Sequence, residues 1–346
     1  MKKKLLTILL VCLLSMLFTS SISADETKTL SIYNQNVAGL PIPAIFNDNY
    51  KIVSNAQKRI GKVLNSSGYD VVCVQEDFTY HDILSAQMTN YKYKTKTSGS
   101  IPYGDGLNIF SKYPIYNVER VAWKQAYGVI TAYCDELTPK GFLKVTIDVN
   151  GILIDLYDIH MDAGSSEQDM KAKASQYKQM SDYIKKNSTE NPVIIVGDFN
   201  TELHDDRCGF YETMLSGENK FTDCWSYSNG NEDFRTDKDS KIAKYTSELG
   251  SSQSHWDSLE RCLFRSSNKV TVDLISGSFK YQPSSDVKDN PYALSDHYAS
   301  VQKFNIAGIK VEQNLEKQAK ESILSKTTRV VTSIVKDLKL LFTSGR

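Results

Sequence analysis

The fold is decided by one stretch, Val193-Ile194-Ile195-Val196-Gly197-Asp198-Phe199-Asn200. Its first four residues are aliphatic and β-branched, which predicts a strand that is buried on both faces. The strand ends in Gly-Asp-Phe-Asn, so a carboxylate and a carboxamide directly follow an apolar segment. Asp and Asn also favour ordinary turns, and this stretch alone fits an Asx turn equally well. A functional site becomes the better interpretation because other predicted strands of the chain also end in polar residues.

Polar residues also stand at the ends of the other main predicted strands. These strands run from Leu30 to Val37, from Val71 to Val74 and from Ile152 to Ile159, and a closing strand follows Tyr298. A buried carboxylate at such an end needs a cation, hydrogen-bond donors or water, although each residue alone is compatible with a turn or a surface position. The polar residues at these ends are Asn36, Glu76, His160, Asp296 and His297.

Helices and a hairpin separate these strands. Apolar residues at helical spacing predict helices over about 50–64 and 169–185. Asn150-Gly151 joins two apolar segments and predicts a tight β-hairpin turn. A further strand, Trp256 to Arg265, carries Glu260 beside its apolar positions.

Composition restricts the possible functions only weakly. The 346 residues include 41 basic and 41 acidic side chains, so the net charge provides no long-range field for nucleic acid, although a local basic patch is compatible with it.

No Cys or His cluster has the spacing of a zinc site, so we expect no zinc site. Cys73 is expected as a buried thiol, and Cys208 and Cys224 flank a polar loop and are the best disulfide candidates. Cys134 and Cys262 cannot be paired from the sequence.

The two ends of the chain differ from the central region. The N-terminal sequence predicts a bacterial secretory signal peptide over residues 1–24, and hence a secreted or cell-surface protein. Three lysines are followed there by an apolar run from Leu5 to Phe18 and by small residues up to Ala24. The run is shorter than the roughly 20 residues that span a bilayer, which disfavours an uncleaved anchor. Residues 308–346 predict an amphipathic, basic helical tail that packs on the domain or, as the second choice, lies on anionic lipid.

The polar residues at the strand ends form an inventory suited to one chemistry. Carboxylates offer the hard oxygen ligands that Mg²⁺ prefers, and the ion neutralises charge on a phosphoryl group. Imidazoles serve as base or acid near neutral pH. The set therefore predicts metal-assisted hydrolysis of a phosphate ester.

The same residues resemble the motifs of the endonuclease/exonuclease/phosphatase superfamily. The matching segments occur in the family's order over residues 28–305: Asn36 to Leu40, Gln75-Glu76, His160, Gly197 to Asn200, and Ser295 to His297. The resemblance implies a four-layered α/β sandwich, in which two mostly antiparallel sheets pack face to face with helices outside. It also implies a single catalytic domain over residues 25–307.

The resemblance also implies roles for these residues. Glu76 looks like the principal ligand of Mg²⁺, or alternatively of Mn²⁺, Ca²⁺ or Co²⁺, with Asn36 beside it and Asp296 as a second carboxylate on the metal side. His297 looks like the general base or a phosphate-polarising group. Asp198 would position the attacking water, Asn200 would hold the phosphate, and His160 would stabilise the transition state or protonate the leaving group.

The substrate class is predicted from three further segments. Pro139-Lys140-Gly141-Phe142, Gln75 to Phe78 with His81, and His160 to Gly164 resemble secreted bacterial sphingomyelinases. Asp77 and Phe78 stand where nucleases of this superfamily usually carry an Arg, which disfavours nucleic acid. We therefore expect a monomeric phosphodiesterase acting on a phospholipid head group, with membrane contact through the tail as the second choice for that segment. A secreted nuclease, a phosphomonoesterase and an inactive binding module are the alternatives.

One departure from the family pattern generates a prediction. The family usually has an Asp that orients the last histidine, and here that place holds Glu260, with Asp257 nearby. The longer side chain can still reach His297. We expect Glu260→Gln to reduce kcat sharply, since an amide does not stabilise an imidazolium as a carboxylate does. Steady-state kinetics of the purified variant checks this, and turnover near that of the natural chain would refute the assignment.

Overall fold

The computed structural model describes residues 26–40, 48–128, 132–201, 205–230, 259–282, 295 and 297–308. The predicted signal peptide, the tail beyond Gly308, and Asp257 and Asp296 lie outside these residues. Among the described residues no helix is both long enough and apolar enough to cross a membrane.

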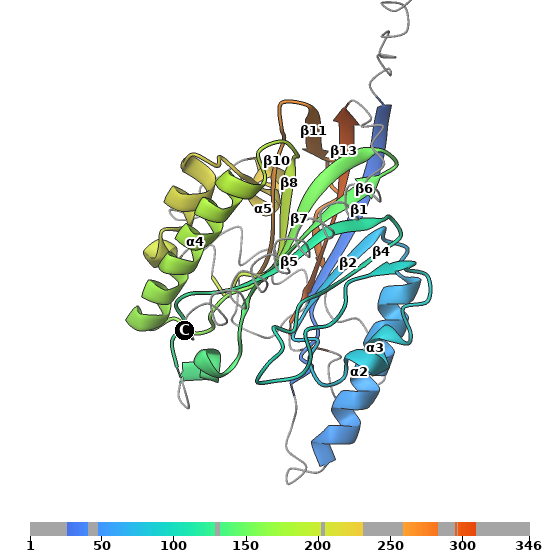
Figure 1. Cartoon of the computed structure of the whole chain (residues 1–346), viewed down its shortest axis with the longest axis vertical. Helices are drawn as coiled ribbons and strands as arrows, with labels where there is room; N and C mark the ends of the chain where they lie inside the picture. Colours follow the sequence, from blue (N-terminus) through green and yellow to red (C-terminus); the bar gives the residue numbers. More distant parts are fainter. Residues whose placement is uncertain are drawn as a thin grey trace, which may run out of the picture.

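Two sheets pack face to face in the centre of the molecule, with helices on the outer side of each (Figure 1). In the described residues the first sheet has the order β11 (Val270–Leu274), β13 (Ala299–Gly308), β1 (Glu26–Asn36), β2 (Val71–Gln75), β4 (Asn108–Ser111) and β3 (Tyr93–Lys94), and β12 (Lys280–Gln282) also pairs with β13. The second sheet has the order β5 (Ile115–Ala122), β6 (Gly141–Val149), β7 (Ile152–His160), β8 (Val193–Asp198), β10 (Glu260–Arg265) and β9 (Thr222–Asp223).

Only two strand pairs within the described sheets are parallel, β1 with β2 and β7 with β8. Helices α2 (Asp48–Ser66) and α3 (His81–Ser85) lie outside the first sheet, and α4 (Glu167–Asn187) and α5 (Cys224–Ser228) lie beside the second. The prediction of a four-layered sandwich with mostly antiparallel sheets is confirmed.

Strand β8 is apolar throughout because both of its faces are covered. Ile194 and Val196 belong to the core between the two sheets. Val193 and Ile195 belong to a second core, between this sheet and α4. A strand enclosed in this way shows a continuous apolar run rather than alternation, which is the pattern the sequence carries.

The local signals in the sequence also have structural counterparts. Asn150 and Gly151 both adopt positive φ, 54° and 98°, as the two-residue turn between β6 and β7 requires. Helix α4 begins with a capping box in which Ser166 and Asp169 satisfy each other's backbone amides.

The predicted disulfide between Cys208 and Cys224 is wrong, because both thiols are buried and free. The two residues belong to different apolar cores. Cys224 lies with Cys262 between the sheets, whereas Cys208 lies under α4. The intervening sheet separates the two thiols, which spacing along the chain could not reveal.

Gly197 generates a prediction about stability. Its φ is 148°, and a Cβ added there would lie 2.1 Å from the carbonyl oxygen of Ile159 on the neighbouring strand. We expect Gly197→Ala to lower the free energy of unfolding by about 3 kcal/mol, since the backbone of β7 would have to move. Gly68→Ala is the control, because Gly68 also has a positive φ of 81° but faces open space. It should cost only about 1 kcal/mol. Urea unfolding of both variants measures the difference, and equal losses would contradict the steric explanation.

Candidate active site

The strand ends meet at one end of the sandwich because of the register of the strands. Asn36 pairs with Gln75 across the parallel strands β1 and β2. His160 pairs with Asp198 across β7 and β8, and Asp198 pairs with Glu260 across β8 and β10. In Figure 1 this is the lower end of the two sheets, at the C-terminal ends of β1 and β2.

The Asn36 carboxamide links the two sheets at this end. Its amide nitrogen donates to Glu76 Oε1 at 3.0 Å and to Asp198 Oδ2 at 3.1 Å. Its Oδ1 atom accepts from the backbone amide of Ala38 at 3.0 Å, which fixes the orientation of the group. Two carboxylates from different sheets therefore converge on one amide.

Backbone strain accompanies this convergence. Glu76 and Asn200 adopt positive φ values of 56° and 47°, which are uncommon for residues other than glycine. Glu76 directly follows β2, and Asn200 stands two residues beyond the end of β8. Strained positions of this kind persist where the surrounding structure holds them, and they cluster at functional sites.

His160 is buried and faces both carboxylates. Its Nε2 atom lies 3.5 Å from Asp198 Oδ2 and 4.0 Å from Glu76 Oε1. Burial, together with the nearby Lys140 ammonium, lowers the pKa of His160 well below its ordinary value, so the imidazole is neutral at neutral pH. Burial alone would raise the pKa of Asp198, but His297, together with the hydrogen bond from Asn36 and the Lys140 ammonium, outweighs burial and holds this pKa below its ordinary value.

His297 is held from two sides. Its Nδ1 atom lies 2.6 Å from Glu260 Oε1, so the longer glutamate does reach the histidine. The His297 backbone amide donates to Ser295 Oγ at 3.2 Å, and this hydroxyl donates to the carbonyl of Asn36 at 2.6 Å. The last histidine is thereby tied to the first site strand.

Asn200 is fixed by its neighbours. Its backbone amide donates to Asp198 Oδ1 at 2.9 Å, and its side-chain amide donates to the carbonyl of Met161 at 3.0 Å. The buried ammonium of Lys173 donates to the Asn200 carbonyl and, at 2.5 Å, to the Gly164 carbonyl. These contacts hold the turn after β8 against the turn after β7.

The donor set fits a divalent cation. Ligand atoms of Asp198, Glu260 and His297 lie within 4.8 Å of one another. Glu76 adds a third carboxylate, which shares the Asn36 amide with Asp198, and the Glu76 side chain is partly exposed. Hard cations favour such clustered carboxylate oxygens, and a nearby cation would offset the repulsion between the two acids.

The structure brings together seven of the eight residues singled out from the sequence, and the eighth, Asp296, lies outside the described residues. Sequence reasoning assigned no part to Lys173 or Ser295. The burial of Lys173 could have been predicted from the sequence. It lies three residues after Met170 and four before Tyr177, which places it on the apolar face of the predicted helix. Lys140 was part of a sequence motif but had no predicted role. In the structure it pairs with Asp135 Oδ1 at 2.5 Å and donates to the Met161 carbonyl at 3.3 Å.

The neutral state of His160 predicts how stability depends on pH. The unfolded chain binds a proton at this residue below about pH 6.5, whereas the folded chain does not, so His160 reduces stability as the pH falls. We therefore compare the free energy of unfolding of His160→Gln with that of the natural chain, both in EDTA. As the pH is lowered from 7 to 5, the difference should change by up to about 2 kcal/mol in favour of the variant.

His81 provides the matched control for this experiment. Burial acts to lower its pKa, but the 2.6 Å contact with Asp77 outweighs burial and the pKa is raised. Its contribution to stability is present at low pH and disappears as the pH rises, so His81→Gln should change the pH dependence in the opposite direction. Urea unfolding at both pH values measures each variant, and shifts of the same sign would exclude this explanation.

Solved structures with a similar fold include a beta toxin, a sphingomyelinase C and TDP2. A beta toxin mutant from Staphylococcus aureus with bound magnesium ions has 21% identity and a TM-score of 0.55, covering 80% of this chain and 99% of the other. Sphingomyelinase C from Streptomyces griseocarneus has 20% identity and a TM-score of 0.55, covering 82% and 99%. TDP2 of D. rerio, complexed with a single-strand DNA product, has 18% identity and a TM-score of 0.58, covering 80% and 99%. At these identities the likeness concerns the fold.

Sequence comparison is more specific. Sphingomyelinases of Mycobacterium bovis and Mycobacterium tuberculosis are 30% identical to this chain over 224 residues, which are 60% of this chain and 40% of each relative. The match therefore spans less than half the length of these curated relatives. The model of Endonuclease/Exonuclease/phosphatase family 2 matches residues 9–246, well over half of the chain. The chain therefore belongs to the Endonuclease/Exonuclease/phosphatase family.

Proposed function

We propose that this protein is a secreted, Mg²⁺-dependent phosphodiesterase that hydrolyses the head group of a phospholipid, in the manner of a sphingomyelinase. One observation carries the proposal: two carboxylates from different sheets converge beside a neutral histidine and a second histidine held by a carboxylate. The curated relatives named sphingomyelinase support the choice of substrate class.

The proposed metal ligands are Glu76, Asn36 and Asp296. Glu76 is the most accessible of the site carboxylates that the structure describes, and Asn36 lies directly against it. A bound Mg²⁺ supplies neutralisation of the phosphoryl oxygens and a lowered pKa of water. Asn36 would bind the ion through its Oδ1 atom, which in the structure accepts from the Ala38 amide, while its amide nitrogen donates to both acids and orients them.

The chain's own residues would move the protons. His297 would donate a hydrogen bond from its Nδ1–H group to the Glu260 carboxylate, so its Nε2 atom can accept a proton from water as the oxygen–phosphorus bond forms. Asp198, held ionised, would orient that water. His160, as a neutral imidazole, would donate a hydrogen bond where charge develops as the ester bond breaks, and Asn200 would hold the phosphate. The Glu260 carboxylate would stabilise the resulting imidazolium.

The residues after Glu76 favour the lipid substrate over nucleic acid. Asp77 is buried and engaged internally, since its Oδ2 atom lies 2.6 Å from His81 Nδ1 and accepts from the Asn108 amide at 2.9 Å. The position therefore offers no cation to a phosphate backbone. The zero net charge of the chain agrees with this choice.

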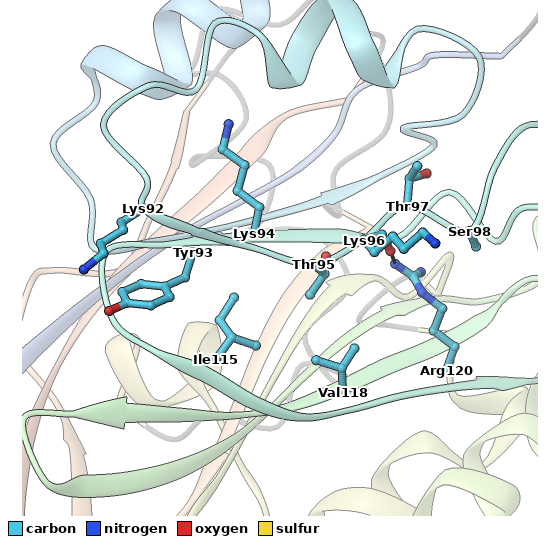
Figure 2. Close-up of a pocket in the computed structure, with 10 residues that line it drawn as sticks. All are labelled: Lys92, Tyr93, Lys94, Thr95, Lys96, Thr97, Ser98, Ile115, Val118 and Arg120. Carbon is cyan, nitrogen blue, oxygen red and sulfur yellow. Dashed lines mark hydrogen bonds between the residues drawn. The ribbon is translucent and has the colours of Figure 1, made fainter. Parts of the chain in front are cut away.

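One observation favours the nuclease alternative. A groove of about 730 Å³ separates the edge strands of the two sheets, and Figure 2 shows Tyr93 and Thr95 facing Ile115 and Val118 across it. Exposed lysines lie along one wall, at positions 92, 94 and 96. A polyanion could lie beside them, but lysines on an edge strand also prevent aggregation. Arg120, at the same groove, is already paired with Asp105 at 2.6 Å.

The remaining features belong to the same proposal. Residues 1–24 would direct export and be removed, and residues 25–307 would form the monomeric catalytic domain. Residues 308–346 would pack on this domain or contact lipid.

The decisive experiment measures hydrolysis by residues 25–346 of sphingomyelin liposomes and plasmid DNA in parallel. We expect Mg²⁺-dependent release of phosphocholine that EDTA abolishes and that His297→Ala reduces by at least about a hundredfold. Asp182→Ala, on the exposed face of α4, serves as the control and should retain activity.

The outcomes separate the candidates. DNA cleavage with the same dependence on Mg²⁺ and His297 would move the protein to the nuclease branch. If neither substrate is hydrolysed, a third assay with a soluble phosphomonoester follows, and phosphate release there would identify a phosphomonoesterase. Lipid hydrolysis that survives both EDTA and His297→Ala would overturn the proposed mechanism.

A further inference from the structure

A layer of polar side chains lies directly beneath the site, inside the core between the sheets. Its members are Asn34, Gln75, Asp158 and Ser300, and all four are 0% exposed. Asn34 lies two residues before Asn36, and Asp158 two residues before His160. Because side chains alternate along a strand, each points to the same face as the site residue above it.

Hydrogen bonds connect this layer across both sheets. The Gln75 amide donates to Asp158 Oδ1 at 2.6 Å and to Asn34 Oδ1 at 2.7 Å. The Asn34 amide in turn donates to Ser300 Oγ at 3.4 Å. The chain of contacts therefore starts on β7 of one sheet and continues through β2, β1 and β13 of the other.

The surrounding core makes this layer unusual. One step deeper, Cys73 and Leu156 replace Gln75 and Asp158 on the same strands, and both belong to the apolar core. Burying amide and carboxyl groups costs free energy unless they are paired with each other. Aliphatic side chains would fill the same space without this cost, so stability alone does not explain the polar pair.

The position of the pair indicates what it does. Gln75 is covalently joined to Glu76, and Asp158 lies on the strand that carries His160. Unlike apolar packing, a hydrogen bond is directional, so it restricts sliding of one sheet over the other. The Asn36 bridge above it spans the same two sheets, with contacts of 3.0 and 3.1 Å.

We propose that Gln75 and Asp158 are positioning residues, whose hydrogen bond between the sheets sets the separation of Glu76 from His160 and Asp198. This inference rests on the proposed function of the site above. Neither residue touches the reacting atoms. A misplacement of about 1 Å in such a site can reduce turnover a hundredfold, so a single buried contact of this kind can control the rate.

The test compares three variants. Gln75→Met keeps the length of the side chain without its amide, and Asp158→Ala removes the acceptor. Both should lower kcat at least about tenfold while KM changes less than about twofold. Asp158→Asn keeps an oxygen acceptor and should restore kcat to within about twofold. The double variant Gln75→Met/Asp158→Ala should lose no more than the worse single variant, because both remove the same contact.

The matched control lies on the same strand. Asp155 is also buried, but on the opposite face of β7, where Thr146 and Ser188 donate to it at 2.8 and 2.6 Å. Asp155→Ala should lower the melting temperature without changing kcat. If Asp155→Ala lowers kcat as much as Asp158→Ala does, or if the double variant multiplies the two losses, the positioning role is excluded.

A second readout does not depend on activity. The chain has five histidines, so imidazole resonances in the NMR spectrum of the metal-free protein can be assigned. The resonances of His160 should shift in Gln75→Met and Asp158→Ala but not in Asp155→Ala. Unchanged His160 resonances in the first two variants would overturn the inference. Failure of the natural chain to hydrolyse lipid, with these shifts present, would instead count against the proposed function alone.

Discussion

The site depends on one constraint, which is that two carboxylates are held close together where two apolar sheets meet. Glu76 and Asp198 come from different sheets and share the amide of Asn36. Carboxylates in such surroundings require donors or cations, since burial and mutual repulsion both disfavour their charge. The other site groups satisfy this requirement in turn. His160 faces both acids, and His297 approaches Asp198 within 3.8 Å.

The sandwich architecture makes this convergence possible. Parallel pairing of β1 with β2 and of β7 with β8 places their C-terminal ends at the same end of the molecule. Antiparallel pairing of β10 with β8 brings Glu260 opposite Asp198, from which it reaches His297. A sheet on each side holds the groups, and the strained backbone of the described site residues, at Glu76 and Asn200, lies in the turns after β2 and β8. Preorganised groups of this kind need little rearrangement during a reaction.

Much of the fold followed from local patterns. The buried strand before Asp198, the hairpin at Asn150-Gly151 and the two long helices were all predicted and are all present. The disulfide between Cys208 and Cys224 was wrong because a sheet lies between their cores. The reach of Glu260 to His297 was inferred from side-chain length, and the 2.6 Å contact agrees with it.

The sequence by itself determined which polar residues stand at strand ends, because burial and alternation leave a local record in the order of residues. It also determined the likeness to a phosphoesterase family. Only the tertiary structure decided which of these groups meet. Asn36 and Asp198 are 162 residues apart, Gln75 and Asp158 are 83 apart, and Asn34 and Ser300 are 266 apart. Such contacts depend on strand order and on the packing of one sheet against the other, and no local pattern of residues specifies either.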